Sequence, residues 1–141
     1  MRLFTQNVKV EALKRAPLFE GLSKKELAEL TRVTEDLQVE AGTVLCREGR
    51  LGREFFVIVD GVAEVTKSGK RIATREAGEF FGEIALLMTT KRTATVTAKT
   101  PLRCFILTRG DFRRVLDESP GVERKVMQAL AERLLSYTQD L

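Results

Sequence analysis

The residues best suited to chemistry lie in one stretch, residues 80–96, which reads FFGEIALLMTTKRTATV. Gly82 and Glu83 open a short apolar segment that is expected to form a helical turn, and Arg92 precedes a run of β-branched residues typical of a strand. Free N–H groups at the start of a helix bind anions, and a glycine lets the anion approach the backbone closely. Arg92 adds a planar, permanently charged fork that suits a phosphate.

Glu83 restricts which anion fits such a site. A carboxylate beside a phosphate makes sense only if it faces away from the phosphate, towards hydroxyl groups that donate hydrogen bonds to it. A sugar phosphate offers both an anion and neighbouring hydroxyls. Taken singly, Arg92 would be an ordinary arginine at a strand end and Glu83 an acid favoured by the helix dipole. Together they predict a sugar-phosphate site.

This stretch resembles the phosphate-binding cassette of cyclic nucleotide-binding domains, the family that includes the catabolite activator protein and the regulatory subunits of protein kinase A. The likeness covers nearly the whole chain, and Leu107 and Phe112 match the start of the helix that follows the strands. The other matching segments follow in order: Pro17-Leu18-Phe19, Gly21-Leu22-Ser23, Ala41-Gly42, Arg47-Glu48-Gly49, Gly52, residues 55–59, Gly61 and Gly78-Glu79.

The resemblance assigns roles within the cassette. It implies that Arg92 and backbone N–H groups around Ala85 and Thr93 hold the ligand phosphate. It also implies that Glu83 accepts a hydrogen bond from the ribose 2′-hydroxyl, with Gly82 lending backbone contacts. The implied ligand-binding residues are Gly82, Glu83, Ile84, Ala85, Arg92, Thr93 and Ala94, with Val65 and Ile72.

The base needs apolar walls, and two candidates come from neighbouring strands. Val65 and Ile72 align with family positions that line the pocket, although each is equally well explained as plain core. In the terminal helix, Leu130, Leu134 and Tyr137 lie on one face and would close over the base as a lid. A homodimer seam, or packing against the barrel, explains the same stripe equally well, because an apolar stripe does not reveal its partner.

Thr93 bears on the choice of base. It either serves the strand through its β-branched shape or places its hydroxyl on the ligand. In several cGMP-preferring relatives a threonine here contacts the guanine edge, whereas bacterial cAMP binders also carry serine or threonine. We therefore expect cAMP as the ligand and keep cGMP as the alternative.

Composition limits the class of protein. The chain has 141 residues, of which 43% are apolar and 31% charged, as in a single soluble domain with its own core. Its formal net charge is +4, but basic residues are interleaved with acidic ones, so no direct contact with nucleic acid is expected. The N-terminal residues lack a signal-peptide core and no apolar run is long enough to span a membrane, so a cytoplasmic location is expected.

The chain lacks histidine, which excludes Ser-His-Asp and Cys-His catalysis within it. No nucleophile–base pair, Walker loop or metal cluster is visible, so an enzyme is not expected. Cys46 and Cys104 lie in strand-like segments without a neighbouring cysteine, and we predict buried thiols.

The hydrophobic period predicts one domain over residues 1–141, mainly β with flanking helices. Helices are expected in residues 1–36, with a capping box at Ser23 and Glu26 and a helix from Lys24 to about Thr34. An antiparallel jelly-roll barrel is expected in residues 37–107, the cassette included. Helices return in residues 108–141, one over 111–118 and a last one over about 122–137. The expected strands are 37–39, 43–47, 55–59, 62–67, 71–74, 92–98 and 102–107.

These features predict a non-catalytic module that senses a cyclic nucleotide and passes the signal on by movement of its terminal helix. Its output would be an unknown effector protein or a fused domain. The chain ends directly after the terminal helix, so the expected alternative is a regulatory fragment of a helix-turn-helix transcription factor, a channel, an acyltransferase or a kinase. A scaffold that kept the fold and lost the pocket is less consistent with intact Gly82, Glu83 and Arg92.

Overall fold

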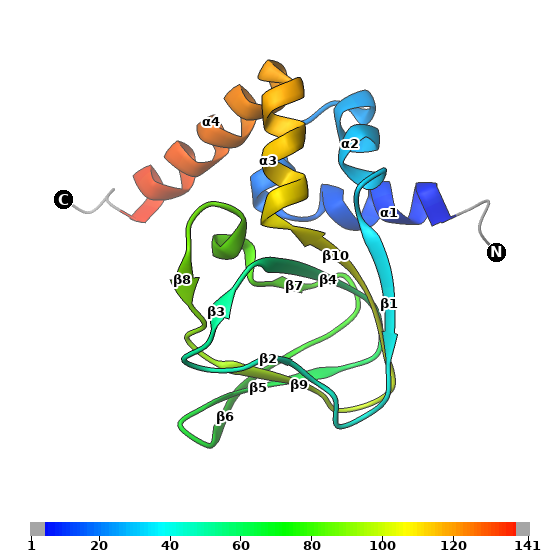
Figure 1. Ribbon diagram of the computed structural model, residues 1–141, viewed down its shortest axis with the longest axis vertical. Coiled ribbons are helices and arrows are strands. Elements are labelled where there is room, and N and C mark those ends of the chain that lie inside the picture. Colours follow the sequence, from blue (N-terminus) through cyan, green and yellow to red (C-terminus); the bar gives the residue numbers. More distant parts are fainter. Residues whose placement is uncertain (1–4, 138–141) are drawn as a thin grey trace.

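Helices from both ends of the chain flank a central run of strands in the computed structural model, which describes residues 5–137 (Figure 1). The N-terminal elements are α1 (Thr5–Lys14), the 3₁₀ turn η2 (Pro17–Phe19) and α2 (Lys24–Thr31). The short 3₁₀ helix η3 (Glu83–Leu86) lies among the strands. The C-terminal elements are α3 (Arg109–Glu118) and α4 (Pro120–Tyr137).

Within residues 5–137 the strands form two four-stranded sheets and a two-stranded ribbon, and every pairing is antiparallel. This confirms the predicted class, mainly antiparallel β with flanking helices. The first sheet has the order β1 (Glu35–Val39), β10 (Leu102–Thr108), β4 (Glu54–Asp60) and β7 (Phe80–Phe81). The second has the order β2 (Val44–Cys46), β9 (Thr95–Ala98), β5 (Ala63–Lys67) and β6 (Lys70–Arg75), and the ribbon pairs β3 (Leu51–Gly52) with β8 (Thr90–Lys91).

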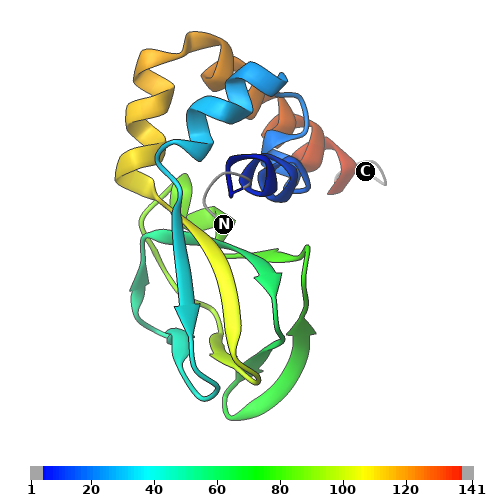
Figure 2. The same cartoon turned by 90° about the vertical axis from the view of Figure 1, so that its right-hand side faces the viewer.

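The central strands of the first sheet, β10 and β4, are buried on both faces, because the helices cover one face and the second sheet covers the other. Successive residues of a strand point to opposite faces. In β4, Phe55 and Val57 therefore pack among the helices, whereas Phe56 and Ile58 join the interior between the two sheets. Figures 1 and 2 show the helices gathered at one end of the β-structure.

Aromatic contacts join the helical core to the strand that precedes the cassette. The Phe19 ring meets the Phe55 ring edge-on at 5.9 Å between centroids, and Phe55 lies 5.8 Å from Phe80. On the other face of β4, Phe56 stacks on Phe81 at 4.7 Å. Phe55 and Phe56 are thus core residues, and these contacts place the two residues before Gly82 against β4.

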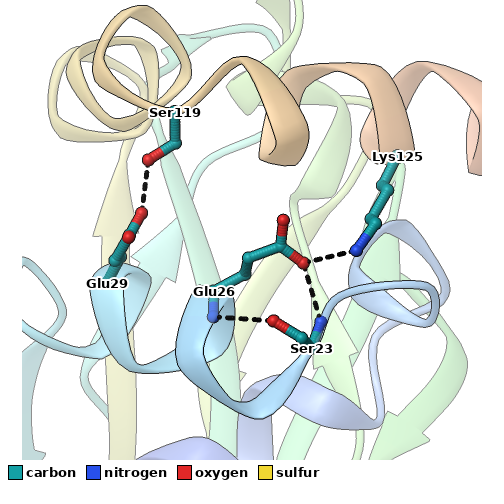
Figure 3. A network of polar contacts seen from close by, with 5 residues as sticks. All are labelled: Ser23, Glu26, Glu29, Ser119 and Lys125. Atoms are coloured by element: carbon teal, nitrogen blue, oxygen red, sulfur yellow. Dashed lines mark hydrogen bonds and ion pairs between the residues drawn. The ribbon is translucent and has the colours of Figure 1, made fainter.

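A polar network ties α2 to the C-terminal helices (Figure 3). The predicted capping box is present: the Ser23 hydroxyl accepts from the Glu26 N–H at 3.1 Å, and Glu26 Oε1 accepts from the Ser23 N–H at 2.8 Å. The same Oε1 accepts from Lys125 Nζ of α4 at 2.7 Å. Nearby, the Ser119 hydroxyl, between α3 and α4, donates to the Glu29 carboxylate. One carboxylate thus caps α2 and holds α4.

Several predicted boundaries are wrong, each for a local reason. Helix α2 ends at Thr31 and not near Thr34, and the hydroxyls of both threonines bond back to carbonyl groups of the helix, each at 2.8 Å. Helix α4 begins at Pro120 and not near residue 122, since proline is tolerated in the first helical turn. The predicted strand 92–98 starts only at Thr95. The two-residue strands β3, β7 and β8 were not predicted, because so short a strand shows no alternation of apolar and polar residues.

We predict that Glu26→Gln lowers the free energy of unfolding by about 1 kcal/mol near neutral pH, the usual worth of a helix cap. The hydrogen bond from Lys125, with that from the Ser23 N–H, holds the pKa of Glu26 below its ordinary value of 4.5. A depressed carboxyl pKa stabilises the fold above the ordinary pKa, and this contribution is lost as the pH falls through the folded-state pKa. Urea unfolding of both proteins should therefore show a difference that shrinks below pH 4.5.

The exposed Glu20 provides the control, because Glu20→Gln removes a similar charge outside the network. This variant should unfold like the wild type across the same pH range. A loss for Glu26→Gln that stays constant down to about pH 3 would contradict the linkage between this carboxyl and stability.

Candidate ligand site

All nine residues singled out from the sequence line one cavity of about 480 Å³. Its wall is built by the second sheet, β7, η3 and the segment between β8 and β9. The nine are Val65, Ile72, Gly82, Glu83, Ile84, Ala85, Arg92, Thr93 and Ala94. Cavities of this size are typical of small-molecule sites.

The backbone of Arg92 is held on both sides by the loop that leads into β3. The Arg92 N–H donates to the Arg50 carbonyl at 2.7 Å, and the Arg92 carbonyl accepts from the Gly49 N–H at 2.9 Å. Directly before it, Leu51 pairs with Lys91 in the ribbon of β3 and β8. Arg92 is thus fixed in position directly after the ribbon of β3 and β8. Because its backbone is bonded to the loop before β3, strand β9 begins only at Thr95.

The Arg92 guanidinium lies against two glycines. A Cβ atom added to Gly52 would lie 2.1 Å from Arg92 Nε, and one added to Gly82 would lie 2.7 Å from Arg92 Nη1. Gly82 also has φ of +83°, a conformation that side-chain-bearing residues rarely adopt. Both positions therefore need glycine for the guanidinium to occupy this place.

Glu54 supplies the polar partners of this guanidinium. Arg92 Nη2 donates to the Glu54 backbone carbonyl at 2.9 Å and approaches the Glu54 carboxylate Oε1 at 3.4 Å. The Arg92 side chain is only 10% exposed, whereas that of Glu54 is 46% exposed. The carbonyl bond fixes the fork in place, and the long ion pair with a half-exposed carboxylate adds little.

The cassette turn presents Glu83 and Ala85 to the same cavity. Gly82 precedes η3, and the Ala85 N–H donates to the Gly82 carbonyl at 3.1 Å. Glu83 is 8% exposed and lines the cavity. Leu86, on the other side of the turn, is buried in the helical core with Phe55 and Phe112. Leu86 thus anchors the turn in the helical core while Glu83 lines the cavity.

The apolar wall is provided by the second sheet. Val65 and its cross-strand partner Val96 are buried and line the cavity beside Cys46. Val65 is therefore both core and cavity wall. Ile72 differs, because it is 58% exposed and has no place in the core. It is skipped in the pairing of β5 with β6, where Val65 faces Ala73 and Thr66 faces Arg71.

The two cysteines are buried and free, as predicted. Burial raises the pKa of Cys46 to about 11 and that of Cys104 to about 12. Both thiols stay protonated near neutral pH and serve as small apolar side chains.

Sequence reasoning missed several residues that belong to this site. Arg75, Lys91 and Cys46 line the cavity, and Glu54 holds Arg92. The Glu54 contact is made mainly by a backbone carbonyl, so no side-chain pattern signals it. The sequence identified Gly52 only as part of a family motif, and its contact with Arg92 was not predicted.

The terminal helix reaches the helical core with its first half. Val126 is buried there and Leu130 packs against the same cluster. The side chains of Leu134 and Tyr137 lie outside the described residues, so the lid and the homodimer seam stay predictions. Met127 and Leu135 are 64% and 63% exposed.

Comparison with known proteins identifies the family. A profile of the cyclic nucleotide-binding domain matches residues 36–119, which is more than half of the chain. This chain belongs to the cyclic nucleotide-binding domain family. The cAMP-dependent protein kinase regulatory subunit of Yarrowia lipolytica is 41% identical over 106 residues, covering 74% of this chain and 28% of that protein. The cyclic nucleotide-gated potassium channel RHE_CH03180 of Rhizobium etli is 35% identical over 117 residues, covering 83% of this chain and 33% of that protein.

Solved structures share the fold. The N-terminal domain of a transcriptional regulator from Streptomyces coelicolor A3(2) superposes with a TM-score of 0.86 at 29% identity, covering 91% of this chain and 95% of that domain. The chain spans a third or less of the length of the two curated relatives. The proteins that it matches include a kinase regulatory subunit, a potassium channel and a transcriptional regulator. Along residues 5–137 no helix is both long and apolar enough to cross a membrane, and no cluster of side chains is arranged for a metal ion.

We predict that Gly52→Ala weakens binding of an anionic ligand to the cavity, since the new methyl group would occupy the place of Arg92 Nε. Displacing the fork should cost about 1.5–3 kcal/mol, the worth of a hydrogen bond to a charged group. Isothermal titration with a cyclic nucleotide measures the loss.

Gly110→Ala is the matched control, because nothing lies within 4 Å of a Cβ atom built there. It should bind like the wild type, and alanine favours the helix in which it lies. Equal affinities for Gly52→Ala and the wild type would show that ligand binding does not depend on the packing of the guanidinium against Gly52.

Proposed function

We propose that this chain is a regulatory module that binds a cyclic nucleotide, with cAMP as its principal ligand, and that it performs no chemistry itself. The observation that carries the proposal is the packing of the Arg92 guanidinium against Gly52 and Gly82, at the wall of a cavity that Glu83 also lines. A fixed cation beside a buried carboxylate suits a ligand that offers an anion and hydroxyl groups together.

The cyclic phosphate binds at Arg92, with backbone N–H groups near Ala85 and Thr93 as further donors. The phosphate competes with the half-exposed Glu54 carboxylate, but the bond from Arg92 to the Glu54 carbonyl can persist. Because the Ala85 N–H donates to the Gly82 carbonyl, the turn has to shift or share that donor when phosphate arrives. Ligand binding therefore changes the cassette turn itself.

Adenine is the expected base because of what a relative of this chain responds to. The Yarrowia lipolytica relative is a cAMP-dependent kinase subunit, and its 41% identity covers most of this chain. The cavity also offers apolar surface from Val65, Ile72 and Val96 to a planar purine. Thr93 lies at the same cavity and is the residue through which a guanine 2-amino group would be recognised.

The signal leaves the cassette through α3. Helix η3 packs against both β4 and α3, and Leu86 shares the helical core with Phe112 of α3 and Val126 of α4. Arg109, the first residue of α3, also donates a hydrogen bond to the Thr89 hydroxyl in the loop after η3. A shift of the turn therefore changes packing under α3 and α4, and it moves the terminal helix relative to the strands. The output is a fused domain or an effector protein.

We predict that Arg92→Ala and Arg92→Leu reduce cAMP affinity sharply while the fold survives. Losing a charge-assisted bond to a phosphate in a buried site costs on the order of 2–5 kcal/mol. Arg92→Lys should recover only part of the loss, because an ammonium group lacks the fork. Isothermal titration gives the affinities and thermal unfolding reports the fold.

Arg53→Ala serves as the control, since this exposed arginine lies next to Glu54 but outside the cavity lining. Its affinity should match the wild type. Unchanged titration curves for both Arg92→Ala and Arg92→Leu would remove Arg92 from the site and end the proposal.

We predict that Glu83→Ala weakens binding of cAMP more than binding of 2′-deoxy-cAMP. The reason is that the carboxylate accepts from the 2′-hydroxyl, which only the ribonucleotide has, and such a bond is worth about 1.5–3 kcal/mol. Titrating both ligands into both proteins isolates this pair. Glu76→Ala, an exposed acid outside the cavity lining, is the control. Equal losses for the two ligands would mean that Glu83 only stabilises the cassette turn.

A further inference from the structure

Exposed basic side chains from three segments of the chain form one surface beside the cavity. The segments are the loop between β2 and β3, the turn between β5 and β6, and strand β8. The basic surface consists of Arg47, Arg50, Lys67, Lys70, Arg71 and Lys91, all exposed. Residues 47–51, 67–72 and 90–91 contain one acid, Glu48. Six cations and one carboxylate exceed the formal net charge of the whole chain, +4, so the fold concentrates positive charge that the sequence distributes among acids.

Hydrogen bonds and strand pairing hold the three segments side by side. The Ser68 N–H in the β5–β6 turn donates to Glu48 Oε1 at 2.9 Å, and the Glu48 N–H donates to the Thr95 hydroxyl at 3.0 Å. Leu51 of β3 pairs with Lys91 of β8. The carboxylate of Glu48 thus serves as a backbone acceptor that fixes the turn beside the loop.

The β5–β6 turn is less stable than its sequence could make it. Lys67 and Lys70 are direct cross-strand partners, and like charges in this position destabilise a hairpin. Ser68 has φ of +52°, and among residues 5–137 it is the one residue other than glycine with a positive φ. Within the same residues none of the six cations forms an ion pair with a carboxylate. An anionic partner would relieve this repulsion.

Two exposed aliphatic side chains accompany the cations. Ile72 follows Lys70 and Arg71, is 58% exposed and is skipped in the pairing of β6 with β5. Leu51 is also 58% exposed, and it shares a face with Lys91 because the two residues lie directly opposite each other. Ile72 and Lys91 both line the cavity, so the two apolar groups belong to neighbouring parts of one surface.

The composition of the basic surface favours a membrane as its partner. Protein interfaces rely on aromatic anchors and are depleted of lysine, and residues 47–51, 67–72 and 90–91 contain no aromatic residue. Single-stranded nucleic acids also need aromatic side chains on which their bases stack. A phosphate backbone alone offers no apolar contact to Ile72 and Leu51. A bilayer with anionic lipids offers charged groups to the cations and an acyl boundary to the aliphatic side chains.

We propose that the basic surface docks this protein on membranes that contain anionic lipids, with Ile72 and Leu51 entering the headgroup layer. The inference goes beyond the proposed function and does not depend on it, because the cyclic nucleotide is assigned to Arg92 inside the cavity and the lipids to side chains around it. The attraction is electrostatic between exposed groups, so salt weakens it.

The test is sedimentation of the wild-type chain with vesicles of phosphatidylcholine and phosphatidylserine, compared with vesicles of phosphatidylcholine alone. We expect binding to the anionic vesicles only. The turn variant, with Lys67→Gln, Lys70→Gln and Arg71→Gln together, should bind them on the order of a hundredfold more weakly, because each cation near an anionic surface strengthens binding roughly fivefold. These three residues lie outside the cavity lining, so isothermal titration should show unchanged cAMP affinity.

The matched control combines Lys24→Gln, Lys25→Gln and Arg113→Gln. It removes the same charge from exposed positions of α2 and α3, and it should bind the anionic vesicles like the wild type. Thermal unfolding checks the fold of both variants, and the turn variant should be at least as stable as the wild type because the repulsion in the turn is gone. No binding of the wild type to anionic vesicles, or equal binding of the wild type and the turn variant, would overturn the proposal and leave the proposed function standing.

A second variant distinguishes a membrane from another polyanion. Leu51→Ser keeps all six cations, and it should weaken vesicle binding severalfold because the aliphatic side chain no longer enters the headgroup layer. An unchanged vesicle affinity would overturn the part assigned to Leu51. Binding of the wild type to duplex DNA but not to anionic vesicles would overturn the membrane as partner and assign the basic surface to nucleic acid.

Discussion

The Arg92 guanidinium lies where two backbone segments meet, residues 52–54 and the cassette turn at Gly82, and the geometry of the site follows from these contacts. Gly52 lies against its Nε, Gly82 against its Nη1, and the Glu54 carbonyl accepts a hydrogen bond from its Nη2. The backbone of Arg92 is itself bonded on both sides to the loop that ends in β3. A flexible side chain is thereby held in one orientation before a ligand arrives, so little conformational entropy remains to be lost on binding.

The same arrangement connects the site to the helices. Strand β4 carries Phe55 on its helical face and Phe56 on its inner face, and both rings contact the residues that lead into Gly82. Leu86, on the far side of the cassette turn, belongs to the helical core. The turn that presents Glu83 to the cavity is thus packed into the layer that contains α3 and α4. A closely packed core responds to a displaced turn by repacking, which gives ligand binding a physical route to the terminal helix.

Sequence alone predicted the parts of this protein that depend on local chemistry. The capping box at Ser23, the burial of both cysteines and the convergence of the cassette residues on one cavity follow from short motifs. Contacts between distant segments were not predicted; the packing of the Arg92 side chain against Gly52 is an example. That Arg75 lies on the face of β6 that lines the cavity was not predicted for a different reason. Alternation counted from Ile72 would place Arg75 on the opposite face, but the irregular pairing at Ile72 shifts the register by one residue.

The central claim is that the cavity holds a phosphate and a ribose at fixed positions in one ligand. Isothermal titration of the wild-type chain with cAMP, compared with 5′-AMP, tests it most directly. In cAMP the ring closes the phosphate onto the ribose, so that Arg92 and Glu83 can engage both groups at once, whereas the phosphate of 5′-AMP rotates freely and its ordering costs entropy. The account predicts saturable binding of one cAMP per chain and much weaker binding of 5′-AMP. Absence of cAMP binding, or equal affinity for the two nucleotides, would contradict it.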